Sequence, residues 1–241
     1  MFLDRTTVGP ANLAFTDRHG GVSRGRFASL DFGTADGQDA DEFAANHALL
    51  AAAIGLDPHR LVFSHQVHGA DVALVEDPPK QPPTADGLVT ATDGLALVVR
   101  VADCVPVLMA DPVARVIGAA HAGRRGAVVG VVAATVARMV EQGADPLRMV
   151  ARIGPCICGR CYEVPPALQA EVVARIPAAA STTSWGTAGV DVPGAVGAQL
   201  LELGISTDRV PVCTRESPDL FSYRRDHPTG RSVGVIWLDS A

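Results

Sequence analysis

Lysine, aromatic side chains and excess positive charge are all scarce in this sequence. Lys80 is the only lysine, and 20 basic residues against 26 acidic ones leave a formal charge of −6. A chain with this charge lacks the basic surface with which proteins coat nucleic acid or anionic lipid. Aromatic residues make up 5% of the chain, too few to favour a platform on which single-stranded bases stack. We therefore expect no nucleic-acid partner.

Long apolar runs and a disulfide framework are missing as well. No stretch approaches the ~20 apolar residues of a membrane-spanning helix. Residues 1–8 have neither the basic start nor the apolar core of a signal peptide. The chain has 5 cysteines, three of them bunched between positions 156 and 161, which does not suit a secreted disulfide scaffold. We therefore expect no membrane association and a cytoplasmic location.

The composition that is present is that of an ordinary globular protein. Hydrophobic residues make up 48% of the 241 positions and charged residues 19%, which excludes wholesale disorder. No internal repeat and no shift in composition divides the chain. The sequence therefore predicts one domain spanning residues 1–241.

Apolar patterning predicts a mixture of strands and helices. Short runs rich in Val, Leu and Ile indicate strands buried on both faces, and stretches of helical periodicity end at glycines. The expected strands are residues 61–67, 72–75, 95–101, 105–110, 115–120, 149–153 and 233–238. The expected helices are residues 41–54, 126–142, 167–175 and 195–203. Residues 1–40 show weak periodicity, and residues 18–25 are expected to form a loop. Strands and helices do not alternate strictly, so we expect an α+β fold with mixed sheets flanked by helices.

Three short segments carry more reactive side chains than packing requires. His68 lies beside a glycine turn, Cys104 follows Asp103 in the gap between two expected strands, and His121 precedes the longest expected helix. Two imidazoles and a thiolate are a plausible ligand set for Zn²⁺, with a fourth position free for water or substrate. The spacing leaves two other interpretations open. Cys104 could be a nucleophile activated by His121, or all three residues could serve packing and capping.

Six sequence strings, in order along the chain, resemble one known family. They are SHQVHGADV (64–72), ADGLVT (85–90), ADCVPVLMADP (102–112), IGAAHAGRRGAVVGVV (117–132), IGPCICGRCYEV (153–164) and LFSYRRDHPTGR (220–231). The chain thus resembles the laccase-domain family, also called multicopper polyphenol oxidase-like, purine nucleoside phosphorylase-like or peptidoglycan editing factor-like. The resemblance extends from about residue 15 to the C-terminus.

The resemblance implies an α+β fold with one zinc ion held by His68, Cys104 and His121. It implies a zinc-dependent purine nucleoside enzyme that phosphorolyses adenosine, inosine, guanosine and methylthioadenosine and deaminates adenosine. A purine nucleoside and phosphate are then the expected partners. Two enzymatic alternatives are a cysteine or zinc hydrolase that edits peptidoglycan precursors and a copper-dependent polyphenol oxidase. Copper is less favoured, because the 7 histidines are spread over loops. A non-enzymatic module that binds a metal or ligand is the other alternative.

Residues beside the three ligands are candidates for catalysis. Deamination by a zinc enzyme needs a carboxylate that handles protons. Asp103, next to Cys104, is the candidate for that role or for orienting a ligand. Phosphorolysis needs a cation or backbone nest that holds phosphate against C1′ of the ribose. Arg125 is the first candidate for the cation, followed by Arg224 and Arg225.

One position departs from the family pattern. Relatives usually read HAGWRG, whereas Arg124 stands here in place of the tryptophan. The change removes a flat wall on which a purine could stack and adds a positive charge near His121. We expect the Arg124 side chain to face the pocket, where it would alter base specificity.

Two further sets of potential ligands are not expected to bind metal. His65 and His68 would point to opposite faces of one strand, so His65 is expected to be a surface or packing residue. Cys156, Cys158 and Cys161 resemble half of a metal knuckle, but without an equal partner motif they fall short of a four-cysteine site. A redox pair of Cys158 and Cys161 is not expected either.

Overall fold

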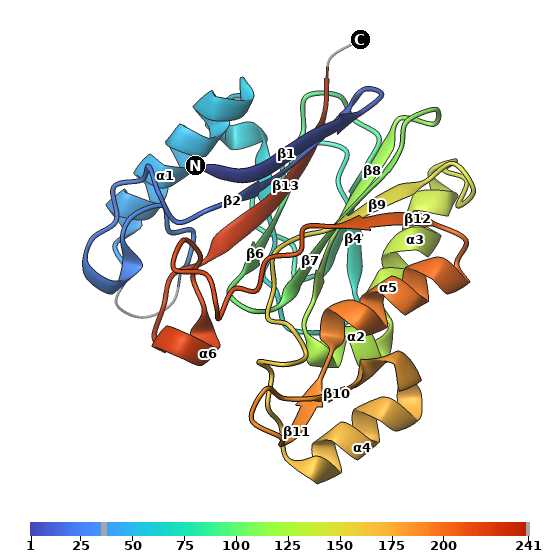
Figure 1. Ribbon diagram of the computed structural model, residues 1–241. Coiled ribbons are helices and arrows are strands. Elements are labelled where there is room, and N and C mark those ends of the chain that lie inside the picture. Colours follow the sequence, from blue (N-terminus) through green and yellow to red (C-terminus); the bar gives the residue numbers. More distant parts are fainter. Residues whose placement is uncertain (35–37, 240–241) are drawn as a thin grey trace.

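The computed structural model describes residues 1–34 and 38–239 and contains two large β-sheets with helices on their outer faces (Figure 1). In spatial order, the five-stranded sheet consists of β1 (Phe2–Val8), β2 (Ala11–Thr16), β13 (Ser232–Leu238), β6 (Ala96–Val101) and β3 (Leu61–Phe63). The six-stranded sheet consists of β12 (Ser206–Arg209), β9 (Val150–Ile153), β7 (Val105–Asp111), β8 (Val116–Ala122), β5 (Gly87–Thr90) and β4 (Val72–Leu74). A separate short hairpin pairs β10 (Ala180–Thr182) with β11 (Ala188–Val190).

Both large sheets are mixed. The pairs β3–β6, β4–β5 and β9–β12 are parallel, and the other pairs are antiparallel. The helices are α1 (Ala40–Ile54), α2 (Arg124–Val129), α3 (Val131–Glu141), α4 (Pro166–Arg175), α5 (Val192–Glu202) and α6 (Tyr223–Asp226). Short 3-10 turns occupy Gly25–Phe27, Pro58–Arg60 and Pro177–Ala179. The expected α+β class with mixed sheets is confirmed.

The core is layered, and β6 shows how. Leu97 and Val99 pack between the two sheets, whereas Ala96 and Val98 pack toward α1 on the outer face. Because side chains alternate along a strand, such a strand must be apolar at every position when both faces are covered. On the far side, α3 and α5 cover the outer face of the six-stranded sheet (Figure 1). The expectation of strands buried on both faces is confirmed.

The helices agree with the sequence patterns except at one glycine. Helix α1 ends at Gly55, whose φ of 74° gives the left-handed cap that glycine favours. The expected helix over residues 126–142 is instead two helices, α2 and α3. Gly130 separates them with φ at 93°. Across residues 1–34 and 38–239, no helix is both long and apolar enough to cross a membrane.

Residues 1–40 have only weak periodicity in the sequence, yet their first part forms the hairpin β1–β2. Strand β1 lies at a sheet edge and carries polar residues on its more exposed side, so it lacks a continuous apolar run. Strand β2 is wholly buried but includes Asn12 and Thr16. Thr16 is satisfied by accepting the Val233 N–H at 2.9 Å. Positions 35–37 and 240–241 of the expected domain lie outside the described residues.

Candidate metal centre and cavity

Three potential metal ligands meet at one end of the six-stranded sheet. Cys104 directly precedes β7, and His121 lies in β8 opposite Pro106 of β7, so the antiparallel register brings the thiol beside the imidazole. His68 comes from the segment between β3 and β4. One ligand atom from each of the three lies within 4.8 Å of the others. The two imidazole rings are 4.8 Å apart at an angle of 66°.

Asp86 holds both histidines in place, a role that the sequence analysis did not predict. It directly precedes β5 and is fully buried. Its Oδ1 lies 2.8 Å from His121 Nδ1. The same carboxylate accepts the backbone N–H groups of Val67, His68 and Gly69 at 3.1, 3.0 and 2.7 Å. With Nδ1 occupied by a carboxylate, the Nε2 of His121 is the nitrogen available to a metal.

The thiol and the imidazole favour each other's charged forms. Burial opposes ionisation of Cys104, but the positive charge of His121 and hydrogen bonds from His121 and His68 outweigh it and lower the pKa of Cys104. Burial also opposes the imidazolium form of His121, yet the Cys104 charge and the Asp86 carboxylate together raise the pKa of His121. Thiolate is the form of cysteine that binds metals or acts as a nucleophile.

The donors His68 and Cys104 lie so close to the backbone at Gly123 that no side chain would fit at that position. A Cβ at Gly123 would lie 2.5 Å from His68 Nδ1 and 3.1 Å from Cys104 Sγ. His68 and Asp103 have φ values of 59° and 92°, in the left-handed region that non-glycine residues rarely adopt. Strain of this kind persists where surrounding structure imposes it, as at functional sites. Two imidazoles and a thiolate, with a buried carboxylate behind the His121 ring, fit Zn²⁺.

A cavity of about 580 Å³ opens beside the three donors, within the usual range for a small-molecule site. Its lining combines these donors with tyrosines and arginines. The lining residues are Gly33, Thr34, Gln38, His65, Gln66, His68, Arg100, Val101, Ala102, Asp103, Cys104, His121, Ala122, Arg124, Ile157, Tyr162, Val192, Tyr223, Arg224 and Arg231.

The arginines that line the cavity differ in whether their guanidinium groups already hydrogen-bond to other protein groups. Arg100 donates to the Ser64 carbonyl at 2.7 Å, and Arg231 donates to the Thr229 carbonyl at 2.9 Å. Arg224 donates to the Glu163 carbonyl at 2.8 Å and lies over the Tyr162 ring at 4.9 Å. Arg124 lines the cavity, as expected, and no hydrogen bond or ion pair of its guanidinium occurs within residues 1–34 and 38–239.

The other two arginines considered for phosphate are not at the cavity. Arg125, one residue further along α2, is exposed and is not part of the lining. Arg225 points its guanidinium at the carbonyls of Thr214, Ser217 and Leu220, at 2.9, 2.6 and 2.7 Å. It therefore braces a loop. The structure brings Arg124 and Arg224, and not Arg125 and Arg225, to the cavity.

Asp103 lines the cavity but is already engaged in hydrogen bonds. Its Oδ1 accepts from the Thr214 hydroxyl at 2.6 Å and from the Ser222 hydroxyl at 2.7 Å, and its Oδ2 accepts from the Arg224 N–H at 2.6 Å. These bonds join the β6–β7 turn to two C-terminal loops. The carboxylate that orients a histidine is Asp86 and not Asp103.

The remaining potential ligands also have defined places. His65 is exposed and lines the cavity, but it is not in the His68–Cys104–His121 group. His65 and His68 were expected to lie in one strand. This expectation was wrong, because strand β3 ends at Phe63. Cys158 and Cys161 lie close to Cys213, outside this cavity.

Comparison with known proteins identifies the family. Residues 12–239 match the family described as multi-copper polyphenol oxidoreductase laccase, and the chain belongs to this family. A protein of Streptomyces coelicolor named purine nucleoside phosphorylase is 55% identical over 99% of this chain and 100% of its own length. A Corynebacterium glutamicum protein with the same name is 45% identical, over 95% of each chain.

Solved structures of relatives share the fold. A Neisseria meningitidis protein has a TM-score of 0.89 and 31% identity, with 99% of each chain covered. The structure of YlmD from Geobacillus stearothermophilus has a TM-score of 0.87 and 32% identity, with 96% of this chain and 93% of that one covered. The resemblance inferred from six sequence strings is confirmed.

Proposed function

We propose that this protein is a zinc-dependent purine nucleoside phosphorylase. The observation that carries the proposal is one cavity lined both by the Cys–His–His donor group and by Arg124, whose guanidinium has no hydrogen bond or ion pair within the described residues. Such a site offers a metal position, an anion position and room for a nucleoside. The relatives named purine nucleoside phosphorylase support the choice of substrate. We place this reaction in the cytoplasm, with adenosine, inosine, guanosine and methylthioadenosine as candidate substrates.

His68, Cys104 and His121 would hold the zinc ion, and Asp86 would fix the orientation of His121. When bound, zinc would supply Lewis acidity at the cavity wall. Zinc is favoured over copper because a thiolate with two imidazoles is a common zinc set, and the group contains no further histidine.

In the proposed reaction the Arg124 guanidinium holds phosphate, since arginine pairs well with phosphate oxygens. A phosphate oxygen forms a bond to C1′ of the ribose while the bond from C1′ to the purine N9 breaks. The electron pair leaves with the base, which takes up a proton, and the other product is ribose 1-phosphate. Tyr162 and Tyr223, which line the same cavity, would provide apolar faces for the nucleoside.

Adenosine deamination is part of the same proposal and needs a group that transfers protons. Asp103 is the candidate acid and base on the cavity wall, where three hydrogen-bond donors hold its carboxylate in place. Arg125 is exposed, so its role in the proposal is limited to long-range attraction of phosphate.

The test is a turnover assay on zinc-loaded protein with the four nucleosides. We expect free base to appear only when phosphate is present, and ammonia to appear from adenosine. Cys104→Ala should abolish both products. If a preparation with a full zinc site releases no base from any nucleoside, phosphorolysis is excluded. Turnover of a muramyl peptide by the same preparation would establish the hydrolase alternative. The lowered pKa of Cys104 is compatible with that alternative, because a thiolate can act as a nucleophile.

A further inference from the structure

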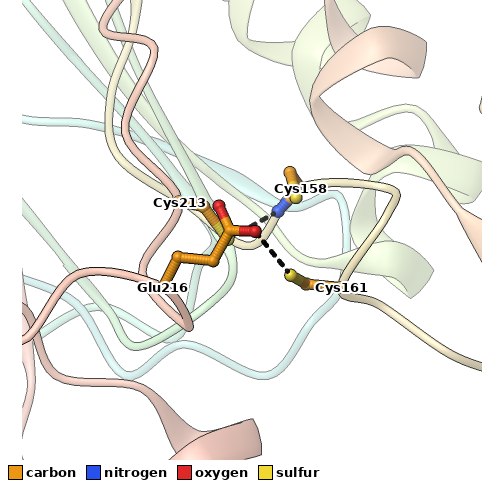
Figure 2. Close-up of side chains that lie close together, drawn as sticks. All are labelled: Cys158, Cys161, Cys213 and Glu216. Carbon is orange, nitrogen blue, oxygen red and sulfur yellow. Dashed lines mark hydrogen bonds between the residues drawn. The ribbon is translucent and has the colours of Figure 1, made fainter. Parts of the chain in front are cut away.

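Outside the cavity, two loops bring four potential metal ligands together. Cys158 and Cys161 follow β9, whereas Cys213 and Glu216 follow β12 (Figure 2). One atom from each residue, three sulfurs and one carboxylate oxygen, lies within 4.8 Å of the others. The bunched cysteines of the sequence are therefore divided. Cys156 is buried outside this group.

Sheet topology explains how residues 55 positions apart meet. Strands β9 and β12 are parallel, with Arg209 opposite Ile153. Beyond their ends the pairing resumes as a parallel bridge between Cys156 and Cys213. The Thr214 N–H donates to the Cys156 carbonyl at 3.1 Å. Both loops therefore leave the same sheet edge side by side, and Cys213 arrives next to Cys158.

Each loop presents its two ligands on a tight turn with the same spacing. The Cys161 N–H donates to the Cys158 carbonyl at 2.9 Å, and the Glu216 N–H donates to the Cys213 carbonyl at 3.2 Å. The pattern is Cys-x-x-Cys paired with Cys-x-x-Glu. Paired turns with two intervening residues are the arrangement by which zinc knuckles present four ligands. The sequence alone did not reveal the second half, because its fourth ligand is a glutamate.

The interatomic contacts suit a shared cation. The Cys158 N–H lies 3.4 Å from Cys213 Sγ, and Cys161 Sγ lies 3.4 Å from Glu216 Oε1 (Figure 2). Two sulfurs bound to one tetrahedral zinc at ~2.3 Å would be ~3.8 Å apart, so small shifts of side chains would complete the site. Cys161 is buried while Glu216 is exposed, which leaves a route for a metal to enter from solvent.

The geometry points to a second metal site, in which Cys158, Cys161, Cys213 and Glu216 bind a structural Zn²⁺. Soft thiolate ligands select zinc over magnesium or calcium, and four protein ligands leave no position for substrate. The site would fasten the loop after β9 to the loop after β12. Ile157 and Tyr162 of the first loop line the cavity, and Thr214 of the second bonds Asp103, so the metal would stiffen one cavity wall.

The test measures metal content in the full chain, with the two sites separated by mutation. We expect about two zinc ions per wild-type chain and about one in Cys104→Ala. In the Cys104→Ala background, Cys213→Ser should remove the remaining ion. Cys156→Ala is the matched control, since it removes a neighbouring buried thiol that is not a ligand, and it should leave zinc content unchanged.

Cobalt provides a second readout that does not depend on activity. Cys104→Ala protein loaded with Co²⁺ should show thiolate-to-cobalt charge-transfer absorption, which only the remaining cysteines could produce. Glu216→Gln keeps all three cysteines and should lower the affinity of this site for zinc at least tenfold in a chelator competition. Loss of a residue that only hydrogen-bonds a metal ligand already lowers metal affinity by about 10–100-fold.

Two results would overturn the second site and leave the proposed function intact. One is a Cys104→Ala protein that holds no zinc after incubation with excess Zn²⁺. The other is a Cys158–Cys161 disulfide, found by mass spectrometry of alkylated protein, that persists when Zn²⁺ is supplied with reductant.

Discussion

Asp86 Oδ1 lies 2.8 Å from His121 Nδ1, although the two residues are 35 positions apart in the chain. A carboxylate behind a metal-ligating histidine fixes the ring orientation and makes the other nitrogen a better ligand. Asp86 also accepts the His68 N–H. One buried side chain therefore sets the geometry of two of the three proposed zinc ligands.

Removing the charge of Asp86 should weaken zinc binding. Asp86→Asn keeps an acceptor oxygen for the backbone N–H groups but loses the carboxylate behind His121. We expect the affinity of this centre for zinc to fall by about 10–100-fold, measured by chelator competition. Asp71→Asn alters an exposed acid in the same loop region and is the control. Equal affinities for the two variants would show that Asp86 has no positioning role.

A single methyl group at Gly123 should disrupt the centre. Its Cβ would lie 2.5 Å from His68 Nδ1, so Gly123→Ala must displace His68 or the start of α2, and zinc occupancy should fall. Gly197→Ala is the matched control, because its Cβ would be 3.9 Å from its nearest neighbour in the middle of α5. The control should keep zinc and gain about 0.5–1 kcal/mol of stability from helix propensity. Full zinc occupancy in Gly123→Ala would count against the ligand assignment.

Neighbouring arginines should differ in their effect on phosphate. Arg124 lines the cavity and Arg125 does not. Hydrogen bonds to charged groups contribute about 1.5–3 kcal/mol, so Arg124→Ala should raise the KM for phosphate by roughly tenfold or more. Arg125→Ala should change it by less than about twofold. Phosphate titrations at saturating nucleoside measure both, and the opposite order would return the phosphate site to Arg125.

The buried carboxylate of Asp111 should make stability depend on pH in the acid range. Burial raises its pKa, but this is outweighed by N–H donors from Ala114, Asp145 and Val113 and by Arg148, and the net effect lowers the pKa. A lowered pKa stabilises the fold above the unfolded value of about 3.9, and that stability is lost as the pH falls through the folded value.

Asp111→Asn should therefore cost about 1–3 kcal/mol near neutral pH, and the difference from wild type should shrink below about pH 4. Urea unfolding of both proteins across this range measures it. A difference that stays constant down to the acid limit would mean that the carboxylate charge does not stabilise the fold.

Local patterns were sufficient wherever neighbours in sequence decide the structure. The strands β6, β7 and β8 could be predicted because a strand buried on both faces needs an unbroken apolar run. The end of α1 could be predicted because a left-handed cap favours glycine. The position of Asp86 was not legible, because its partner lies on another strand. Arg124 and Arg125 differ only by the ~100° rotation between successive helical residues, and the start of α2 must be known to tell which faces the cavity.

The metal-binding residues and the outer cavity residues come from different parts of the fold, so they can be changed independently. Cys104 and His121 are set by the pairing of neighbouring strands in a buried sheet, whereas Tyr162, Tyr223 and Arg224 reach the same cavity from a loop and the short helix α6. Substitutions in those outer segments can reshape what the cavity accepts while the metal-binding end of the sheet stays fixed. A library randomised at positions 162, 223 and 224 should therefore yield altered substrate preferences among variants that all retain zinc at this centre.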